Sequence, residues 1–323
     1  MQYTQLGDSG IEIPRFTVGC MSFGDRNSNF HAWTLNEEET EGVVKHALDL
    51  GLTFFDTANT YAVGTSEEYL GRAIQKHAKR EDVQIATKVF FNEGALGKEA
   101  INREIDGSLQ RLGTEYVDLY IIHRFDYDHP MEEYMEALHG LVQAGKVRAL
   151  GASAMYGFQF ANLQQIAQDN GWTKFVSMQN HYNLLYREDE RELIPICKQQ
   201  NVAVTPYSPL ASGRLSRTEW TTDSERSRLD TTAVSKYDST RETDEVIVAR
   251  VHELSQKHGC TMSQIAIAWH FAKGVAAPIV GATKAQYLDD AVGALDVQLT
   301  AEDVAHLEEP YVPHNLVGLI PHS

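Results

Sequence analysis

Four polar residues, Asp56, Tyr61, Lys88 and His123, could together carry acid–base chemistry. Each lies at or just beyond the end of a short apolar run. In a chain that alternates strands and helices, catalytic side chains collect at such strand ends, because they can converge there while the scaffold stays packed. We therefore expect the four side chains to form one active site.

The chemistry that suits this set is proton donation to a carbonyl oxygen. A tyrosine hydroxyl has an ordinary pKa of about 10, too high for efficient proton transfer at neutral pH unless a nearby cation stabilises the phenolate. Lys88 could supply that cation, and Asp56 could keep the buried lysine protonated. His123 could hydrogen-bond and orient the carbonyl oxygen. The set contains no hydride donor, so carbonyl reduction would need an external cofactor.

Short β-branched or aromatic runs alternate with helical stretches along the chain, which predicts βαβ units and a parallel sheet. Eight strands are expected, at Phe16–Gly19, Thr53–Asp56, Gln84–Lys88, Leu119–His123, Ala149–Ser153, Phe175–Gln179, Val202–Tyr207 and Pro278–Val280. Helices are expected between them, for example at Glu37–Leu50, Ile101–Leu112, Met131–Ala144, Phe158–Asp169 and Glu190–Gln200. The sequence thus predicts an α/β fold, specifically a closed (β/α)8 TIM barrel.

An open doubly wound sheet is the rival architecture. It would carry a glycine-rich phosphate turn after the first strand, whereas Gly19–Asp25 reads GCMSFGD, so the barrel is favoured. Before that strand, Tyr3–Leu6 and Ile11–Ile13 flank the turn Gly7–Gly10, which predicts a β-hairpin that caps the barrel floor.

Two later segments depart from the alternation. Gly213–Asp244, after the seventh strand, is rich in Ser, Thr, Arg and Asp and is expected to be a long loop, either a lid over the barrel mouth or a solvated insertion. A helix is expected at Thr300–Glu309, and the tail that follows it could fold back over the barrel.

Composition predicts one domain spanning residues 1–323 with a large core. The formal charge of −17, from 45 acidic and 28 basic residues, disfavours nucleic acid and anionic membranes as partners. No apolar run resembles a signal peptide or a membrane span, so a cytoplasmic protein is expected. The three cysteines match neither a disulfide framework nor a zinc spacing. No heptad or apolar stripe indicates an oligomeric state.

The segments around the four polar residues resemble the aldo-keto reductase family, and within it a branch of bacterial NADPH-dependent reductases. The matching segments cover nearly the whole chain: residues 55–58 (FDTA) with Tyr61, Gly64, 67–71, 86–88 (ATK), 121–123 (IIH), 145–146 (GK), 151–153 (GAS), Gln179, 182–183 (YN), 207–210 (YSPL) and 278–284. The resemblance implies a (β/α)8 barrel that binds NADPH and reduces an aldehyde or ketone, with Tyr61 as the proton donor.

The resemblance also implies cofactor-binding residues. Ser153 and Gln179 would hold the carboxamide of the nicotinamide, and Tyr207 would stack on the nicotinamide ring. The pyrophosphate would lie by Ser208, Leu210, Ser212, Gly213 and Arg214, and the 2′-phosphate by Gly281, Thr283 and Lys284; Tyr287 and Asp290 complete the set. A cation at position 284 favours NADPH over NADH. Ala154 and Ala291 stand where the family often has asparagine, which weakens one nicotinamide and one adenine contact.

The substrate would be a small carbonyl compound, in a pocket shaped by Phe23, Trp33, Phe90, Arg124 and Phe125. Arg124 and Arg214 leave room for an acidic or phosphorylated substrate. Two other functions stay open. The run His123–His129 could bind a divalent metal for hydrolysis, although we expect no metal. Some relatives in the family are cofactor-binding regulatory subunits, and this chain could be another.

Overall fold

Eight parallel strands form one curled sheet in the computed structural model, which describes residues 1–28, 30–220, 231–281 and 283–320. In sheet order they are β10 (Ile279–Gly281), β3 (Thr17–Gly19), β4 (Phe54–Asp56), β5 (Gln84–Val89), β6 (Val117–Ile122), β7 (Val147–Ser153), β8 (Phe175–Gln179) and β9 (Ala203–Val204). Two backbone hydrogen bonds join its two ends, from Ala276 N to Val204 O at 3.0 Å and from Ile279 N to Pro206 O at 2.9 Å. The predicted (β/α)8 barrel is confirmed.

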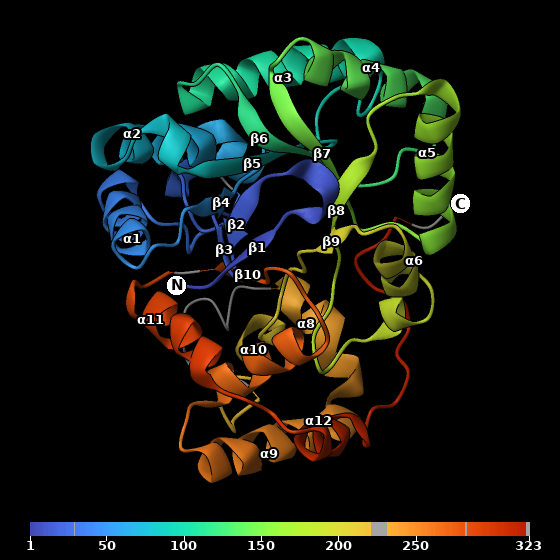
Figure 1. The fold of residues 1–323 in the computed structure, drawn as a ribbon. Coiled ribbons are helices and arrows are strands. Elements are labelled where there is room, and N and C mark those ends of the chain that lie inside the picture. The colour runs from blue at the N-terminus through green and yellow to red at the C-terminus, as the bar shows by residue number, and fades with distance from the viewer. Residues whose placement is uncertain (29, 221–230, 282, 321–323) are drawn as a thin grey trace.

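Helices surround the strands (Figure 1). They are α1 (Glu37–Asp49), α2 (Thr65–His77), α3 (Lys98–Leu112), α4 (Met131–Gln143), α5 (Gly157–Asn170), α6 (Leu193–Gln199), α8 (Thr231–Tyr237), α9 (Arg241–His258), α10 (Met262–Ala272), α11 (Gln286–Gly293) and α12 (Ala301–Glu308). Left-handed glycines follow several of them, such as Gly113 after α3 and Gly171 after α5. None of the helices within the described ranges is long and apolar enough to cross a membrane.

The N-terminal hairpin closes one end of the barrel. Strands β1 (Tyr3–Gln5) and β2 (Glu12–Pro14) pair antiparallel, and Figure 1 shows them across the barrel opening. Leu6, Ile11 and Ile13 are buried in one cluster with barrel residues such as Phe54 and Leu119. The turn needs glycine at position 7, because φ there is +54° and a side chain would collide with the backbone of β8. The predicted hairpin cap is confirmed.

The same buried cluster explains why polar groups meet at the other end of the barrel. Phe54 and Ala86 face the interior next to the hairpin. Because side chains alternate along a strand, Asp56 and Lys88, two residues further on, face the same interior at a higher level. Because Asp56 pairs in register with Ala86, the two strands are staggered, and the polar residue of β4 lies beside the apolar residue of β5. The apolar floor and the polar mouth are therefore two layers of one barrel.

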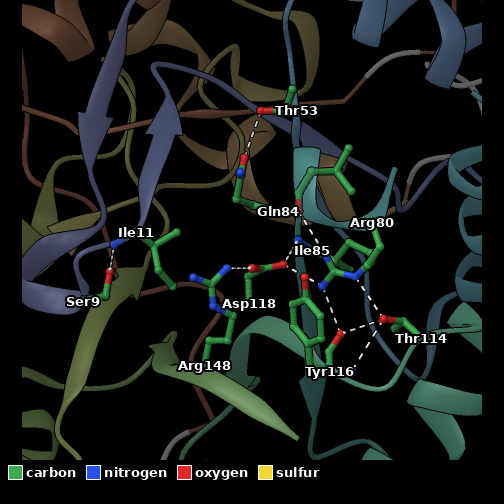
Figure 2. A network of polar contacts seen from close by, with 11 residues as sticks. Ser9, Ile11, Thr53, Arg80, Gln84, Ile85, Thr114, Tyr116, Asp118 and Arg148 are labelled. Atoms are coloured by element: carbon green, nitrogen blue, oxygen red, sulfur yellow. Dashed lines mark hydrogen bonds and ion pairs between the residues drawn. The ribbon is translucent and has the colours of Figure 1, made fainter. Parts of the chain in front are cut away.

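A buried carboxylate organises the floor side of β6 (Figure 2). Asp118 is fully buried and accepts hydrogen bonds from Arg80 at 2.7 Å, Arg148 at 2.8 Å and the backbone N–H of Ile85 at 2.9 Å. The Arg80 guanidinium also lies over the Tyr116 ring, 4.1 Å from its centre. Charge and hydrogen-bond donors thus compensate the buried carboxylate, and the network ties β5, β6 and β7 together.

The stretch Gly213–Asp244 is not the continuous loop that the sequence predicted. Residues 231–237 form α8, and α9 begins at Arg241. Helix α8 is stabilised through Tyr237, which is fully buried beside the barrel mouth. The polar composition of this stretch gave no sign that Tyr237 would be buried. Residues 221–230 of the predicted loop lie outside the described residues.

The tail after α12 returns to the barrel mouth, as expected. The backbone N–H of Val317 donates to the Tyr186 hydroxyl at 3.2 Å, and the Tyr127 hydroxyl donates to the Ile320 carbonyl at 2.9 Å.

Strand β9 is shorter than the sequence predicted. It ends at Val204 rather than at Tyr207, because Pro206 has no N–H group to donate to a neighbouring strand.

Candidate active site

The structure brings the four polar residues together at the carboxyl ends of β4, β5 and β6. Lys88, fully buried, donates to Asp56 Oδ2 at 2.7 Å, to the Thr57 carbonyl at 2.7 Å and to the Tyr61 hydroxyl at 3.2 Å. The Tyr61 and His123 rings meet edge to face, with centres 6.0 Å apart. The predicted convergence of the four side chains is thus present in the structure.

Burial and charge set the protonation states of this group. Burial alone would lower the pKa of Lys88, but the Asp56 carboxylate and the Tyr61 hydroxyl outweigh it and leave that pKa raised. Burial raises the pKa of Tyr61, and the opposing effect of Lys88 only reduces this rise. The lysine is therefore a cation and the tyrosine holds its proton at neutral pH. The lowered tyrosine pKa that the pairing suggested is not found, because desolvation dominates.

His123 is neutral at neutral pH. Burial lowers its pKa well below the ordinary value, and the charges of Lys88 and Arg124 lower it further. Its Nδ1 atom is buried and has no hydrogen-bond partner within the described residues. A neutral imidazole has one N–H donor, which suits a carbonyl oxygen placed between His123 and Tyr61.

The two residues predicted to hold a carboxamide lie on adjacent strand ends. Ser153 and Gln179 pair in register between β7 and β8. The Ser153 hydroxyl is buried with no partner in the described structure, which is costly unless a ligand supplies one. Gln179 already donates to Asp56 Oδ1 at 2.9 Å, so its amide is fixed beside the Lys88 pair. Their polar atoms fit a ligand amide.

Tyr207, the predicted stacking residue, belongs to a column of rings. The His181 imidazole lies parallel to it, with ring centres 5.2 Å apart, and Tyr186 stacks on His181 at 4.2 Å. The ammonium of Lys236, from α8, lies 4.9 Å from the Tyr207 ring centre. The tyrosine ring is thus held in one orientation, and α8 borders it.

The segment after Tyr207 has a strained backbone. Ser208, Ala211 and Ser212 all have positive φ angles, of 57°, 47° and 54°, and Gly213 follows at 92°. Such conformations are costly for residues other than glycine and cluster at functional sites. Leu210 lies within this segment, directly before the turn at residues 211–213.

Arg214 does not offer the free cation that was expected for the pyrophosphate. It is 5% exposed and pairs with Asp238 at 2.6 Å. Its guanidinium also lies over the rings of Trp220 and Tyr237. The partner carboxylate is 24 positions further along the chain, where sequence spacing gives no sign of the pairing. Arg214 instead anchors the segment around α8 to the loop after β9.

The predicted 2′-phosphate residues lie at the end of β10 and the start of α11. Gly281 ends the strand, and Lys284 is exposed just before the helix, with Thr283 half-buried between them. Tyr287 is 49% exposed on α11. Asp290 accepts a hydrogen bond from the Thr261 hydroxyl at 2.7 Å, so it already has a protein partner.

The predicted pocket residues divide into two groups. Phe23 is fully buried in the main core and Trp33 is 7% exposed, stacked on His31, so these two lie beneath the surface rather than on an open wall. Phe90 and Phe125 are half-buried. Phe125 borders an apolar pocket of about 320 Å³, which is also lined by Met131, Tyr156 and Phe158.

The acidic run after His123 serves the loop itself. Asp126 is buried and accepts hydrogen bonds from the backbone N–H groups of Leu96 and Asp128, at 2.9 and 2.8 Å, and contacts His129. Across the ranges that the structure describes, no group of three His, Cys, Asp or Glu side chains is placed to hold a metal ion. The geometry of this run therefore gives no support to the hydrolase alternative.

Comparison with known proteins decides the family. The model of the aldo/keto reductase family matches residues 15–311. This range includes Tyr207, Lys284 and the four polar residues Asp56, Tyr61, Lys88 and His123, called the tetrad from here on. The chain belongs to the aldo/keto reductase family. It is similar to versiconal hemiacetal acetate reductase of Aspergillus parasiticus, at 40% identity over 97% of this chain and 98% of that protein. An aldo-keto reductase of Alternaria alternata is 39% identical, over 98% of this chain and 93% of its own length.

A solved structure supports the same placement. The thermostable aldo-keto reductase Tm1743, crystallised with the inhibitor epalrestat, superimposes with a TM-score of 0.76 and 29% identity, covering 96% of this chain and all of that one. Carbonyl reduction with a nicotinamide cofactor is the general chemistry of the aldo/keto reductases.

Two rings beside the tetrad were not predicted from the sequence. Phe91 meets the His123 ring edge to face, with centres 5.0 Å apart, and Phe30 lies 5.8 Å from the Tyr61 ring. Phe90 and Phe91 follow the end of β5, and Phe90 packs against the main core. Phe91, 47% exposed, borders His123 instead.

Proposed function

We propose that the protein reduces an aldehyde or ketone to an alcohol with NADPH. The single observation that carries this proposal is the buried Lys88 ammonium, which contacts both Asp56 and the Tyr61 hydroxyl. An acid with a cation at its oxygen is suited to give up a proton during carbonyl reduction. A nicotinamide cofactor, when bound, would supply the hydride.

Each residue of the tetrad has a distinct task. Tyr61 transfers its proton to the carbonyl oxygen, and the Lys88 ammonium stabilises the phenolate left behind. Asp56 keeps the lysine charged although the side chains of both residues are buried. His123, neutral, donates a hydrogen bond to the same carbonyl oxygen and so fixes the face that the carbonyl presents.

The fit of a nicotinamide cofactor rests on the unpartnered Ser153 hydroxyl and the held ring of Tyr207. The preference for NADPH over NADH rests on Lys284. This cation is exposed, just before α11. It is therefore available to the extra phosphate of NADPH.

The test follows NADPH oxidation across a panel of aldehydes and ketones with wild type and Tyr61→Phe. Loss of the acid should lower kcat about 10²- to 10⁴-fold while NADPH still binds. Tyr120→Phe is the matched control, because Tyr120 is fully buried on β6 and its hydroxyl has no partner among the described residues. Equal turnover by wild type and Tyr61→Phe would refute the assignment, and tight NADPH binding without any turnover would favour a cofactor-binding regulatory subunit.

A further inference from the structure

Arg124 stands out because it follows His123 directly and its charge has no ion-pair partner within the described residues. Most arginines in the described segments pair with a carboxylate, as Arg80 does with Asp118 and Arg214 with Asp238. Arg124 has one hydrogen bond, from Nη1 to the His123 carbonyl at 2.6 Å, and no carboxylate within 4 Å in the described structure. The adjacent Asp126 is occupied by two backbone N–H groups.

The position of this guanidinium is fixed next to the reacting groups. It lies 5.4 Å from the centre of the Phe91 ring, and that ring in turn contacts His123. Its charge lowers the pKa of His123 and opposes the rise in the pKa of Tyr61. The half-buried Arg124 side chain therefore borders the space where a carbonyl oxygen would sit.

An arginine with free N–H groups in a fixed position is the usual partner of a carboxylate, because its planar fork matches the two oxygens. The surrounding rings add a second requirement. Phe30 beside Tyr61 and Phe91 beside His123 present flat apolar surfaces on the two catalytic side chains. A substrate that meets both conditions carries its carboxylate on a flat apolar spacer.

We propose that Arg124 binds the carboxylate of the substrate, and that the substrate class is carbonyl compounds bearing a carboxylate on an aromatic or similarly flat spacer. This inference rests on the proposed reductase function. It separates the two arginines that the sequence left open, because Arg214 is already paired with Asp238. The free charge is also notable in a chain of net charge −17, which would otherwise repel an acidic substrate.

The experiment compares two nearly isosteric substrates, 4-carboxybenzaldehyde and 4-formylbenzamide, in wild type, Arg124→Gln and Arg124→Lys. Comparing each variant with wild type cancels the intrinsic reactivity of each aldehyde. A charge-assisted hydrogen bond implies that Arg124→Gln lowers kcat/KM for the carboxylate about 10- to 100-fold. The loss for the amide should stay below about threefold, and Arg124→Lys should fall between.

Arg103→Gln is the matched control for net charge, because Arg103 is exposed on α3 and pairs with Glu104. It should leave the ratio of the two kcat/KM values unchanged. Equal losses for both aldehydes in Arg124→Gln would overturn the inference and show that Arg124 acts only on the pKa values of the catalytic groups. If Arg124→Gln still turns over the amide and the ratio of the two kcat/KM values equals that of wild type, the inference about Arg124 is overturned and the proposed reductase function stands. Absence of turnover of either aldehyde by wild type would overturn the inference too, and NADPH oxidation on other carbonyls would then decide whether the proposed function stands.

Discussion

The His181 imidazole lies parallel to the Tyr207 ring, with 5° between their planes and 5.2 Å between their centres. His181 is itself fixed, because Nε2 lies 2.7 Å from the buried Tyr237 hydroxyl of α8. Burial lowers the pKa of His181 well below its ordinary value, so it is a neutral ring rather than a cation. The predicted nicotinamide-stacking residue is thus packed against a neutral ring that α8 holds in place.

Replacing that supporting ring should weaken cofactor binding. In His181→Ala, loss of the stacked pair should raise the cofactor Kd about two- to tenfold, as measured by quenching of tryptophan fluorescence. His181→Phe is the control, because it keeps a ring against Tyr207 but lacks the bond to Tyr237. A Kd that is unchanged in His181→Ala would mean that Tyr207 is oriented without His181.

Reversing the charge at Lys284 should separate the two nicotinamide cofactors. Lys284→Glu should raise the Kd for NADPH about 10- to 100-fold and that for NADH much less, since only NADPH carries the 2′-phosphate. Isothermal titration calorimetry with both cofactors measures the two values. Lys79→Glu, an exposed lysine before β5 on the floor side, controls for net charge. Similar increases for both cofactors would remove Lys284 from the phosphate site.

The hydrogen-bond network around Asp118 should matter for stability and not for catalysis. Asp118→Asn leaves Arg80 and Arg148 without their buried counter-charge and should lower the free energy of unfolding by about 3–5 kcal/mol. Because Asp118 is the second residue of β6 and His123 follows the other end of that strand, kcat at low temperature should stay near wild type. Urea unfolding measures the free energy of unfolding, and steady-state assays measure kcat.

Asp106→Asn is the comparison for that experiment, since Asp106 forms an exposed pair with Lys146. It should change the free energy of unfolding by no more than about 1 kcal/mol. If Asp118→Asn were equally mild, the buried network would be contributing little to stability.

The contact between His314, in the C-terminal tail, and Asp244 should stabilise the protein in a pH-dependent way. His314 Nε2 lies 3.1 Å from both carboxylate oxygens of Asp244, and its backbone N–H donates to Glu188. Burial alone would lower the pKa of His314, but Asp244 outweighs it and leaves that pKa raised. A raised histidine pKa contributes stability that is fully present below the unfolded value of about 6.5 and is lost as pH rises through the folded value.

The thermal midpoint of His314→Gln should therefore fall below wild type by more at pH 5.5 than at pH 8.5, as measured by scanning fluorimetry. His306→Gln, which breaks an exposed contact with Glu253, should show a smaller difference at either pH. A deficit in His314→Gln that does not vary with pH would contradict the ion pair.

Sequence reasoning reached the features that follow from local pattern. Asp56 and Lys88 were predicted to meet because each ends an apolar run, and strand ends of a barrel share one rim. Gly7 and its neighbours predicted the hairpin through turn chemistry. These inferences need only the types of residues that lie within a few positions of each other in the sequence.

Features that depend on contacts between distant segments could not be predicted. The pairing of Arg214 with Asp238, and the burial of Tyr237 that holds α8 in place, join residues across a polar stretch without periodicity. The pKa of Tyr61 depends on how deeply it is buried, which the sequence does not specify. Long-range packing, rather than residue type, decided each of these points.

The tail also affects how functions are compared between relatives. The family match ends at residue 311, yet Val317 and Ile320 lie against rings at the barrel mouth, and a side chain at Gly318 would crowd the Tyr207 hydroxyl. Two proteins can therefore agree throughout the matched region and still present different entrances to the same chemistry. Exchanging residues 312–320 between relatives should transfer part of the substrate preference while the catalytic residues stay untouched.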